Sequence, residues 1–194
     1  MRNPIRLKNL NLRFLPYYVI GLVLLLLHRP AQASLWAAVP LLLVGAALRS
    51  WGAGHLVKND DLTTTGPYAH LRHPLYLGTI LIGTGFAIAL GGAIGLVVVA
   101  VLWPWFAFSY FPRKERAESE RLEARYGDRF AAYRASVPAL RPRLRPWAEG
   151  RASGRSEAPT EWALARYSEN NELGTLLAVV GGWSAFFLRA SIAP

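Results

Sequence analysis

The sequence predicts an all-α integral-membrane helical bundle with about five transmembrane helices and a cytoplasmic charged helix after the fourth. Two observations predict this fold class. Hydrophobic residues make up 53% of the 194 residues and gather in several runs long enough to belong to a membrane. The formal charge is +10, and a soluble nucleic-acid-binding protein of that charge should not carry such runs. The chain has no cysteine, which excludes disulfides, thiolate catalysis and cysteine-based metal sites.

The first two membrane helices are expected at residues 10–28 and 35–57. A basic leader, residues 1–13, overlaps the start of the first, and no small-residue cleavage site follows, so this helix is expected to be retained. The second carries Arg49 and His55 in its latter half. An arginine inside a membrane helix either extends toward the interface or serves a function, and the sequence leaves both alternatives open.

A polar loop at residues 58–73 leads into the third predicted span at 75–90. Pro74 suits the first turn of that helix, because its fixed φ fits there and its missing N–H would be unpaired anyway. The start of such a helix carries free N–H groups and a partial positive charge, which suit an anionic ligand group. A tight glycine turn at 91–92 then joins the third span to a fourth at 94–111, so the two form a hairpin.

The segment 112–145 is charged and differs in composition from the spans before it. Its first part has the spacing of a charged helix, Gly127 is a suitable helix stop, and Asp128 is a suitable N-cap for a second short helix. One interpretation is an amphipathic helix on an anionic membrane surface. The other is that Glu115 and Glu118, which share a face, turn inward to bind a cationic group.

The predicted domain organisation is a membrane core at residues 1–145, a cytoplasmic linker at 146–172 and an extra C-terminal transmembrane helix at 173–194. The segment 112–171 holds 13 of the 22 Lys and Arg residues, whereas the turn near Gly91 holds none. Because basic residues concentrate on the cytoplasmic side, the N-terminus, the polar loop and the charged segment are all expected there. We expect the membrane to be a bacterial-type inner membrane.

Residues 65–78 read TGPYAHLRHPLYLG. This stretch resembles the RHPxYxG signature of the integral-membrane methyltransferases that use S-adenosylmethionine, a group that includes the isoprenylcysteine carboxyl methyltransferases and the phospholipid N-methyltransferases. A hairpin of two spans, a glutamate-containing helix, an aromatic–glycine pair and a tyrosine-rich short helix follow in the family order. In this chain those features fall at Glu118, Leu122, Tyr126 with Gly127, and Tyr133. The resemblance covers about residues 50–145.

The resemblance also implies site residues. It assigns the binding of S-adenosylmethionine to Tyr68, His73, Tyr76, Leu77, Gly78 and Glu118. It assigns catalytic roles to Arg72 and Arg113, which would orient the methyl acceptor or the cofactor carboxylate. In a continuous helix Arg113 and Glu118 point about 140° apart, so both reach one pocket only if the helix begins after Arg113, which Pro112 allows. The family often has a second glutamate at the position of Ser119.

The implied function is transfer of a methyl group from S-adenosylmethionine to a lipidic or isoprenoid acceptor, a carboxylate or an amine, at the cytoplasmic face. An amine acceptor would need to lose a proton, and the sequence offers no strong base candidate except His73. This slightly favours a carboxylate or another easily ionised group as the acceptor. The expected partners are a lipidic acceptor from the bilayer and membrane lipids, without nucleic acid. No metal is expected, because the four histidines lack the spacing of a metal site. The alternative function is a non-enzymatic membrane assembly or lipid-organising protein with a basic surface helix.

Overall fold

The computed structural model describes residues 28–57, 61–147 and 161–192, together with the single positions Val19 and Val23. Every regular element in these parts of the chain is a helix, which confirms the all-α prediction. Three of the described helices are long and apolar enough to cross a membrane, and a fourth apolar helix is shorter. The first predicted span, residues 10–28, lies almost wholly outside the described residues. The count of five spans therefore stays a prediction.

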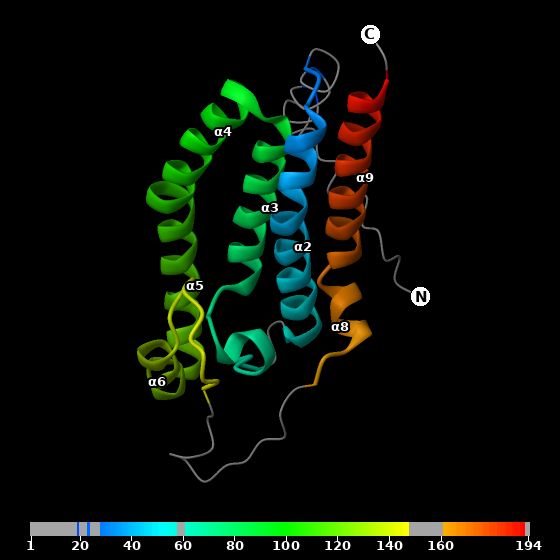
Figure 1. Ribbon diagram of the computed structural model, residues 1–194. Coiled ribbons are helices and arrows are strands. Elements are labelled where there is room, and N and C mark those ends of the chain that lie inside the picture. The colour runs from blue at the N-terminus through cyan, green and yellow to red at the C-terminus, as the bar shows by residue number, and fades with distance from the viewer. Residues whose placement is uncertain (1–18, 20–22, 24–27, 58–60, 148–160, 193–194) are drawn as a thin grey trace.

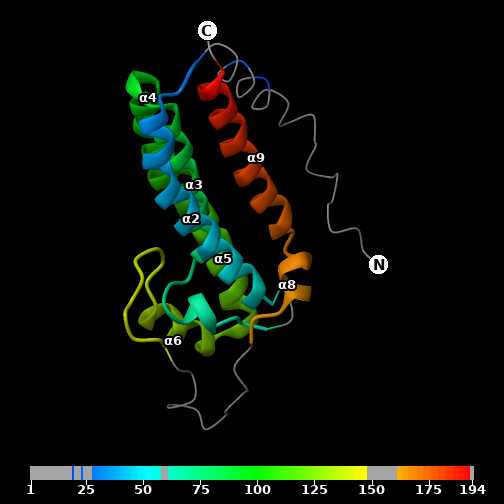
Figure 2. The same ribbon diagram turned by 45° about the vertical axis from the view of Figure 1, so that its right-hand side comes forward.

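The long helices lie side by side, and the shorter elements gather at one end of the bundle (Figure 1). In chain order the elements are α2 (Gln32–His55), the 3₁₀ turn η3 (Gly66–Ala69), α3 (Pro74–Leu90), α4 (Gly92–Pro104), the π-helical η4 (Trp105–Tyr110), α5 (Phe111–Tyr126), α6 (Asp128–Ser136), α8 (Leu164–Glu169) and α9 (Glu172–Ser191). The second to fifth predicted spans thus correspond to α2, α3, α4 with η4, and α9. The views in Figures 1 and 2 agree that α6 and α8 lie at the end opposite the turn between α3 and α4.

The centre of the bundle is a close contact between α2 and α3. A Cβ atom on Gly45 would lie 2.8 Å from the carbonyl oxygen of Gly78, and a Cβ atom on Gly78 would lie 2.8 Å from the carbonyl oxygen of Gly45. Two helix backbones approach this closely only where neither residue has a side chain, as is common in membrane bundles. The third partner is α9, which joins a buried cluster with the other two helices that consists of Leu35, Ala38, Leu42, Ala89, Val179 and Ala190.

A single helix runs without interruption from Gly92 to Tyr126, through α4, η4 and α5. The expectation that a helix begins only after Arg113 is therefore wrong. The π-helical segment explains why Pro112 does not end the helix. The N–H of Phe111 donates to the carbonyl of Phe106, five residues back, so Pro112 falls where the π pattern returns to the α pattern. Proline has no backbone N–H to donate. At this junction the hydrogen-bond pattern is already irregular, so the missing bond does not interrupt a regular α-helix.

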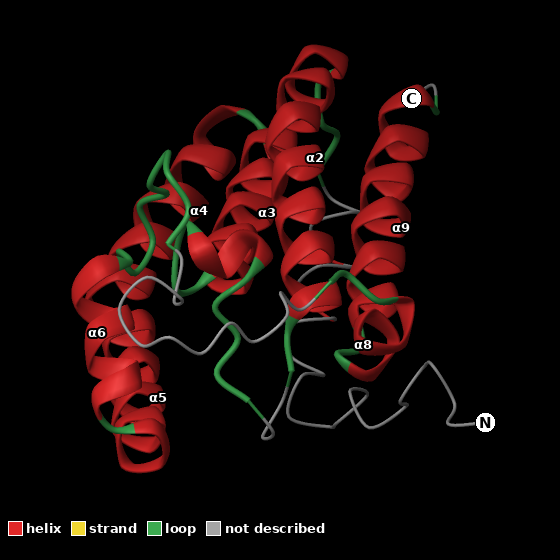
Figure 3. Cartoon of the chain, turned by 90° about the horizontal axis from the view of Figure 1, so that it is seen from below, coloured by secondary structure: helices red, strands yellow, loops and turns green. Residues whose placement is uncertain are grey.

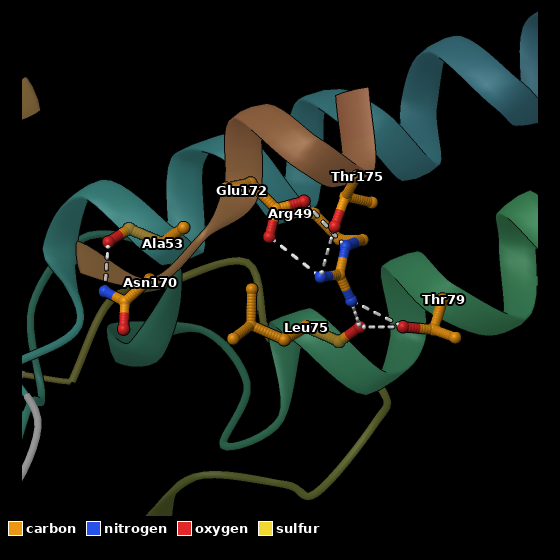
Figure 4. Close-up of polar contacts among 7 residues, drawn as sticks. All are labelled: Arg49, Ala53, Leu75, Thr79, Asn170, Glu172 and Thr175. Atoms are coloured by element: carbon orange, nitrogen blue, oxygen red, sulfur yellow. Dashed lines mark hydrogen bonds and ion pairs between the residues drawn. The ribbon is translucent and has the colours of Figure 1, made fainter. Parts of the chain in front are cut away.

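A buried ion pair ties α9 to α2 and α3 (Figure 4). The Nε and Nη2 atoms of Arg49 each donate to one carboxylate oxygen of Glu172 at 2.8 Å. The Nη1 atom donates to Thr79 Oγ1 at 2.6 Å and to the carbonyl of Leu75 at 3.2 Å, both in α3. Only 17% of the Arg49 side chain and 3% of the Glu172 side chain are exposed. Arg49 therefore does not extend to the interface, because its charge is satisfied inside the bundle.

Residues 161–171, which the sequence assigns to the linker, fold against the end of α2. This stretch, named here the cap segment, contains α8 and ends at Asn171, whose φ is 58°. Seen from below in Figure 3, α8 lies beside α9, whereas α5 and α6 lie on the opposite side of the bundle. The C-terminal helix is thus attached to the bundle both by its own packing and by the segment that precedes it.

Replacing Glu172 by alanine is expected to lower the free energy of unfolding by roughly 3–5 kcal/mol, because the Arg49 charge is then left buried without a counter-charge. The double variant Arg49→Met, Glu172→Leu removes both charges, so it should recover most of the loss. Chemical unfolding in mixed micelles measures both quantities. An alanine variant as stable as the unsubstituted protein would contradict the structural role assigned to this pair.

Candidate functional site

A cavity of about 360 Å³ lies at the end of the bundle that carries α6. Its wall is built from the residues that follow α2, the loop before α3, α5 and α6. Its volume lies within the range of about 300–1,000 Å³ that is usual for small-molecule sites. Six lining residues carry polar groups of interest here, namely Tyr68, Arg72, His73, Glu118, Ser119 and Tyr133. The cavity thus joins the RHPxYxG loop to the glutamate-containing helix.

The loop before α3 is held in shape by the segment that follows α6. The backbone N–H groups of Arg72 and His73 donate to the carbonyls of Pro138 at 2.9 Å and Ala139 at 3.0 Å. In the opposite direction, the N–H of Arg143 donates to the carbonyl of His70 at 3.0 Å. These bonds satisfy the backbone polar groups of an irregular loop, so its shape is determined before any ligand arrives. The helix α6 adds a hydrogen bond from the side chain of Tyr133 to this loop.

Arg72 presents unused hydrogen-bond donors. Its Nη2 atom donates to Glu115 Oε1 at 2.6 Å, and only 11% of its side chain is exposed. Its Nε and Nη1 atoms are buried and have no hydrogen-bond partner among the described residues. A buried cationic donor without a partner is costly, so a ligand group that accepts from either of these atoms would be strongly favoured. An anionic group of carboxylate size fits this requirement.

His73 is buried, with 8% of its side chain exposed, and it lies between two carboxylates. Its Nε2 atom is 3.9 Å from Glu115 Oε1, and its Nδ1 atom is 3.9 Å from Glu118 Oε2. Both distances are too long for hydrogen bonds. Burial, together with the neighbouring Arg72 guanidinium, lowers the pKa of His73 to about 4. The imidazole is therefore neutral at pH 7, and its Nε2 atom has no hydrogen-bond partner among the described residues.

Glu118 lies next to a group of aromatic rings. The hydroxyl of Tyr76 donates to its Oε2 atom at 3.3 Å. The ring of Tyr76 lies 5.3 Å from the ring of His73 and 6.1 Å from that of Tyr110. A carboxylate beside aromatic faces is an environment that attracts a cation. Of the two interpretations of this helix, the structure favours the inward one, because Glu115 already binds the cation of Arg72 and Glu118 faces the cavity.

Two buried tyrosines form the inner wall. The hydroxyl of Tyr133 donates to the backbone carbonyl of Tyr68 at 2.7 Å, which attaches α6 to the loop before α3. Burial raises the pKa of Tyr68 and also that of Tyr133, so both hydroxyls stay protonated in the physiological pH range. They provide shape and hydrogen-bonding groups without charge.

The structure brings four of the predicted site residues to the cavity and places the others elsewhere. Those in the cavity wall are Tyr68, Arg72, His73 and Glu118, and Tyr76 bonds to Glu118 beside it. Leu77 and Gly78 are not among the described lining residues, and Gly78 faces α2. Arg113 is exposed, and its guanidinium donates to the carbonyl of Ser109 at 2.8 Å and to Ser109 Oγ at 3.0 Å. Because its helix is continuous, Arg113 points away from Glu118.

Sequence reasoning missed the part of the wall that comes from the end of α2 and from Ser119. Ser119 is 4% exposed and lines the cavity where the family often has a second glutamate. A helical spacing could have indicated it, since Ser119, Leu122 and Tyr126 recur on one face of α5 and all three line the cavity. No comparable signal marks Leu56 and Val57, which lie at the end of an apolar run.

Comparisons with known proteins bear on this geometry. A family model described as phospholipid methyltransferase matches residues 18–129. The protein-S-isoprenylcysteine O-methyltransferase of Schizosaccharomyces pombe is 32% identical over 82 residues, which cover 42% of this chain and 33% of that protein. The cobalt-zinc-cadmium resistance protein CzcN of Cupriavidus metallidurans is 39% identical over 88 residues, which cover 44% of this chain and 38% of that protein. The chain thus spans between a third and two fifths of the length of these relatives. No solved structure matches it.

The lowered pKa of His73 predicts a specific loss of stability in acid. The unfolded chain takes up a proton on this histidine as the pH falls through about 6.5, whereas the folded chain does so only near 4. Between pH 7.5 and pH 5 the folded state should therefore lose about 2 kcal/mol through His73. Unfolding in mixed micelles at both pH values should show a smaller loss for His73→Gln. Equal losses in the two proteins would mean that His73 titrates normally.

Proposed function

Because the chain belongs to the phospholipid methyltransferase family, we propose that it is an S-adenosylmethionine-dependent methyltransferase. The proposed acceptor is a lipidic or isoprenoid molecule that reaches the site from the bilayer. The proposed location is a bacterial-type inner membrane, with the site on the cytoplasmic side. The observation that carries this proposal is that one cavity is lined both by Arg72 and His73 and by Glu118, which come from the two separate family motifs.

The residues of the cavity fit the proposed cofactor. S-adenosylmethionine carries a carboxylate, an amino group and a sulfonium cation. The two unpaired donors of Arg72 suit the carboxylate, and Glu118 with the neighbouring Tyr76 suits either cation. The orphaned Nε2 atom of His73 offers a further polar contact. When bound, the cofactor supplies an electrophilic methyl group, and the protein supplies the positions of the two reactants.

The chemistry of the cavity favours an acceptor that needs no general base. With a pKa of about 4, His73 is a weak base at pH 7 and would remove a proton from an ammonium group poorly. A carboxylate acceptor is already ionised and nucleophilic, whereas a protonated amine must first lose a proton. We therefore propose that the methyl group is transferred to oxygen. The relative from Schizosaccharomyces pombe is named an O-methyltransferase, which supports this choice.

The distribution of charge supports the proposed orientation. The cavity lies at the same end of the bundle as the charged helices α5 and α6, and the glycine turn between α3 and α4 lies at the other (Figure 1). The positive-inside rule places the basic end in the cytoplasm, where the soluble cofactor is found. The flank of α4 and η4 exposes large apolar side chains that lipid would cover, including Leu96, Val97, Val101 and Phe108.

Binding of labelled S-adenosylmethionine to the protein purified in detergent tests the proposed function. His73→Ala and Glu118→Ala should each weaken the binding at least tenfold, a loss of about 1.4 kcal/mol. Glu120→Ala is the matched control, because Glu120 is exposed on the same helix and is not among the residues that line the cavity. The non-enzymatic alternative is favoured instead if two results are found together. The unsubstituted protein shows no saturable binding of S-adenosylmethionine, and its binding to lipid vesicles depends strongly on anionic lipid.

The nature of the acceptor is tested by incubating membranes that contain the protein with methyl-labelled cofactor. A methyl ester of a carboxylate should release its label as methanol on mild alkaline treatment, whereas an N-methyl group is stable to it. We expect the protein-dependent label in the lipid fraction to be alkali-labile, and mass spectrometry of that fraction identifies the acceptor. Label that survives the treatment would show that an amine is methylated.

A further inference from the structure

The inner end of α2 is capped by residues that lie more than 100 positions later in the chain. The last carbonyl groups of any α-helix have no partner within the helix and are paired by water, side chains or other backbone groups. In α2 the carbonyl of Gly54 accepts from the N–H of Ala163 at 3.0 Å and from Nε of Arg166 at 2.8 Å. The cap segment therefore replaces water at this helix end.

Asn170 makes two further bonds of this kind. Its Nδ2 atom donates to the carbonyl of Ala53 at 2.8 Å and to that of Leu56 at 3.1 Å. Figure 4 shows the first of these bonds next to the ion pair between Arg49 and Glu172. Asn170 thus bonds to a carbonyl inside the last turn of α2 and to the carbonyl of the residue that follows the helix. The cap segment holds the point at which the chain leaves α2.

The indole of Trp162 fits against α2 only because Gly54 has no side chain. Its Nε1 atom donates to the carbonyl of Ser50 at 3.1 Å. A Cβ atom on Gly54 would lie 1.9 Å from the same nitrogen atom, a distance that no packing adjustment short of moving the indole can relieve. The indole therefore packs directly on Gly54, although Trp162 is 46% exposed.

The residues held in this way form part of the cavity. Leu56 and Val57 both line it, and they directly follow the capped turn. The N–H of Val57 donates to Thr63 Oγ1 at 2.9 Å. This bond links a second lining residue, Thr63, to the backbone that follows α2. The cap segment is thus hydrogen-bonded, through Asn170 and the carbonyl of Leu56, to a residue of the cavity that Arg72 and Glu118 also line.

We infer that the cap segment is a positioning element for the cavity: Trp162, Arg166 and Asn170 hold the end of α2, and through it they hold Leu56 and Val57 in the wall. The segment lies beyond the stretch that the family model matches. Its residues touch no ligand in this scheme, since they act through the backbone of α2. The effect on cofactor affinity rests on the proposed function, whereas the effect on the wall does not.

The test uses Asn170→Ala, which removes two bonds to carbonyl groups, and Arg166→Ala, which removes one and serves if the first variant does not fold. The matched control is Arg29→Ala. The Nη2 atom of Arg29 also donates to a backbone carbonyl, that of Ala190, at 3.2 Å, but at the opposite end of α9. All three variants remove a side-chain bond to backbone, so a general loss of stability affects the control as well.

The first measurement is the mobility of a spin label at the wall in the absence of cofactor. Because the chain has no cysteine, Val57→Cys provides a unique attachment point. The label should become more mobile with Asn170→Ala and Arg166→Ala and should be unchanged with Arg29→Ala. Equal mobility in all backgrounds would overturn the inference, even if the protein binds no S-adenosylmethionine.

The second measurement is the affinity for S-adenosylmethionine of the same variants without the label site. Asn170→Ala should weaken binding about tenfold, or about 1.4 kcal/mol, and Arg29→Ala should leave it within about twofold. Unchanged affinity despite a loosened wall would overturn the role of the cap segment in the site while leaving the proposed function intact. Absence of binding in the unsubstituted protein would overturn the proposed function, and the spin label would still decide whether the wall is held.

Discussion

The guanidinium of Arg49 is the interaction on which the arrangement of the bundle depends. It reaches from α2 to the first turns of α3 through Leu75 and Thr79, and to the first turn of α9 through Glu172. Leu75 lies two residues after His73, so the same guanidinium sets where the RHPxYxG loop ends. All three nitrogen atoms of this buried guanidinium are hydrogen-bonded, which stabilises a cation inside a membrane bundle. The same side chain therefore holds both the start of α3, next to the cavity, and the start of the last helix, α9.

The second constraint is the need to pair backbone groups at the end of the bundle. The loop before α3 solves it by bonding to the segment that follows α6, and the end of α2 solves it by bonding to the cap segment. Both solutions bring together stretches that lie far apart in the chain. By contrast, inside the cavity Arg72 and His73 keep buried atoms unpaired. Outside the cavity, the described buried side-chain atoms without a partner are the Oδ1 atoms of Asn170 and Asn171.

Much of the fold could be predicted from the sequence, because apolar runs and glycine turns are local signals. The helices at 32–55, 74–90 and 172–191 begin and end within a few residues of the predicted spans. The partnership of Arg49 with Glu172 could not be predicted, since 123 positions separate them and the glutamate was assigned to the linker. The direction of Arg113 could not be predicted either, because the π-helical segment lets the helix continue through Pro112. In the candidate site, the motif residues that line the cavity were found by resemblance, and the wall from α2 carried no signal.

The uninterrupted helix from Gly92 to Tyr126 also bears on the depth of the proposed reaction. At about 1.5 Å per residue, Glu118 lies about 40 Å along the helix from Gly92, whereas the hydrocarbon core of a bilayer is about 30 Å thick. If the glycine turn lies at one hydrocarbon boundary and the helix runs along the bilayer normal, the carboxylate of Glu118 would lie at headgroup depth on the far side. An amphiphilic acceptor could then be methylated at its polar end without leaving the leaflet that holds its tail.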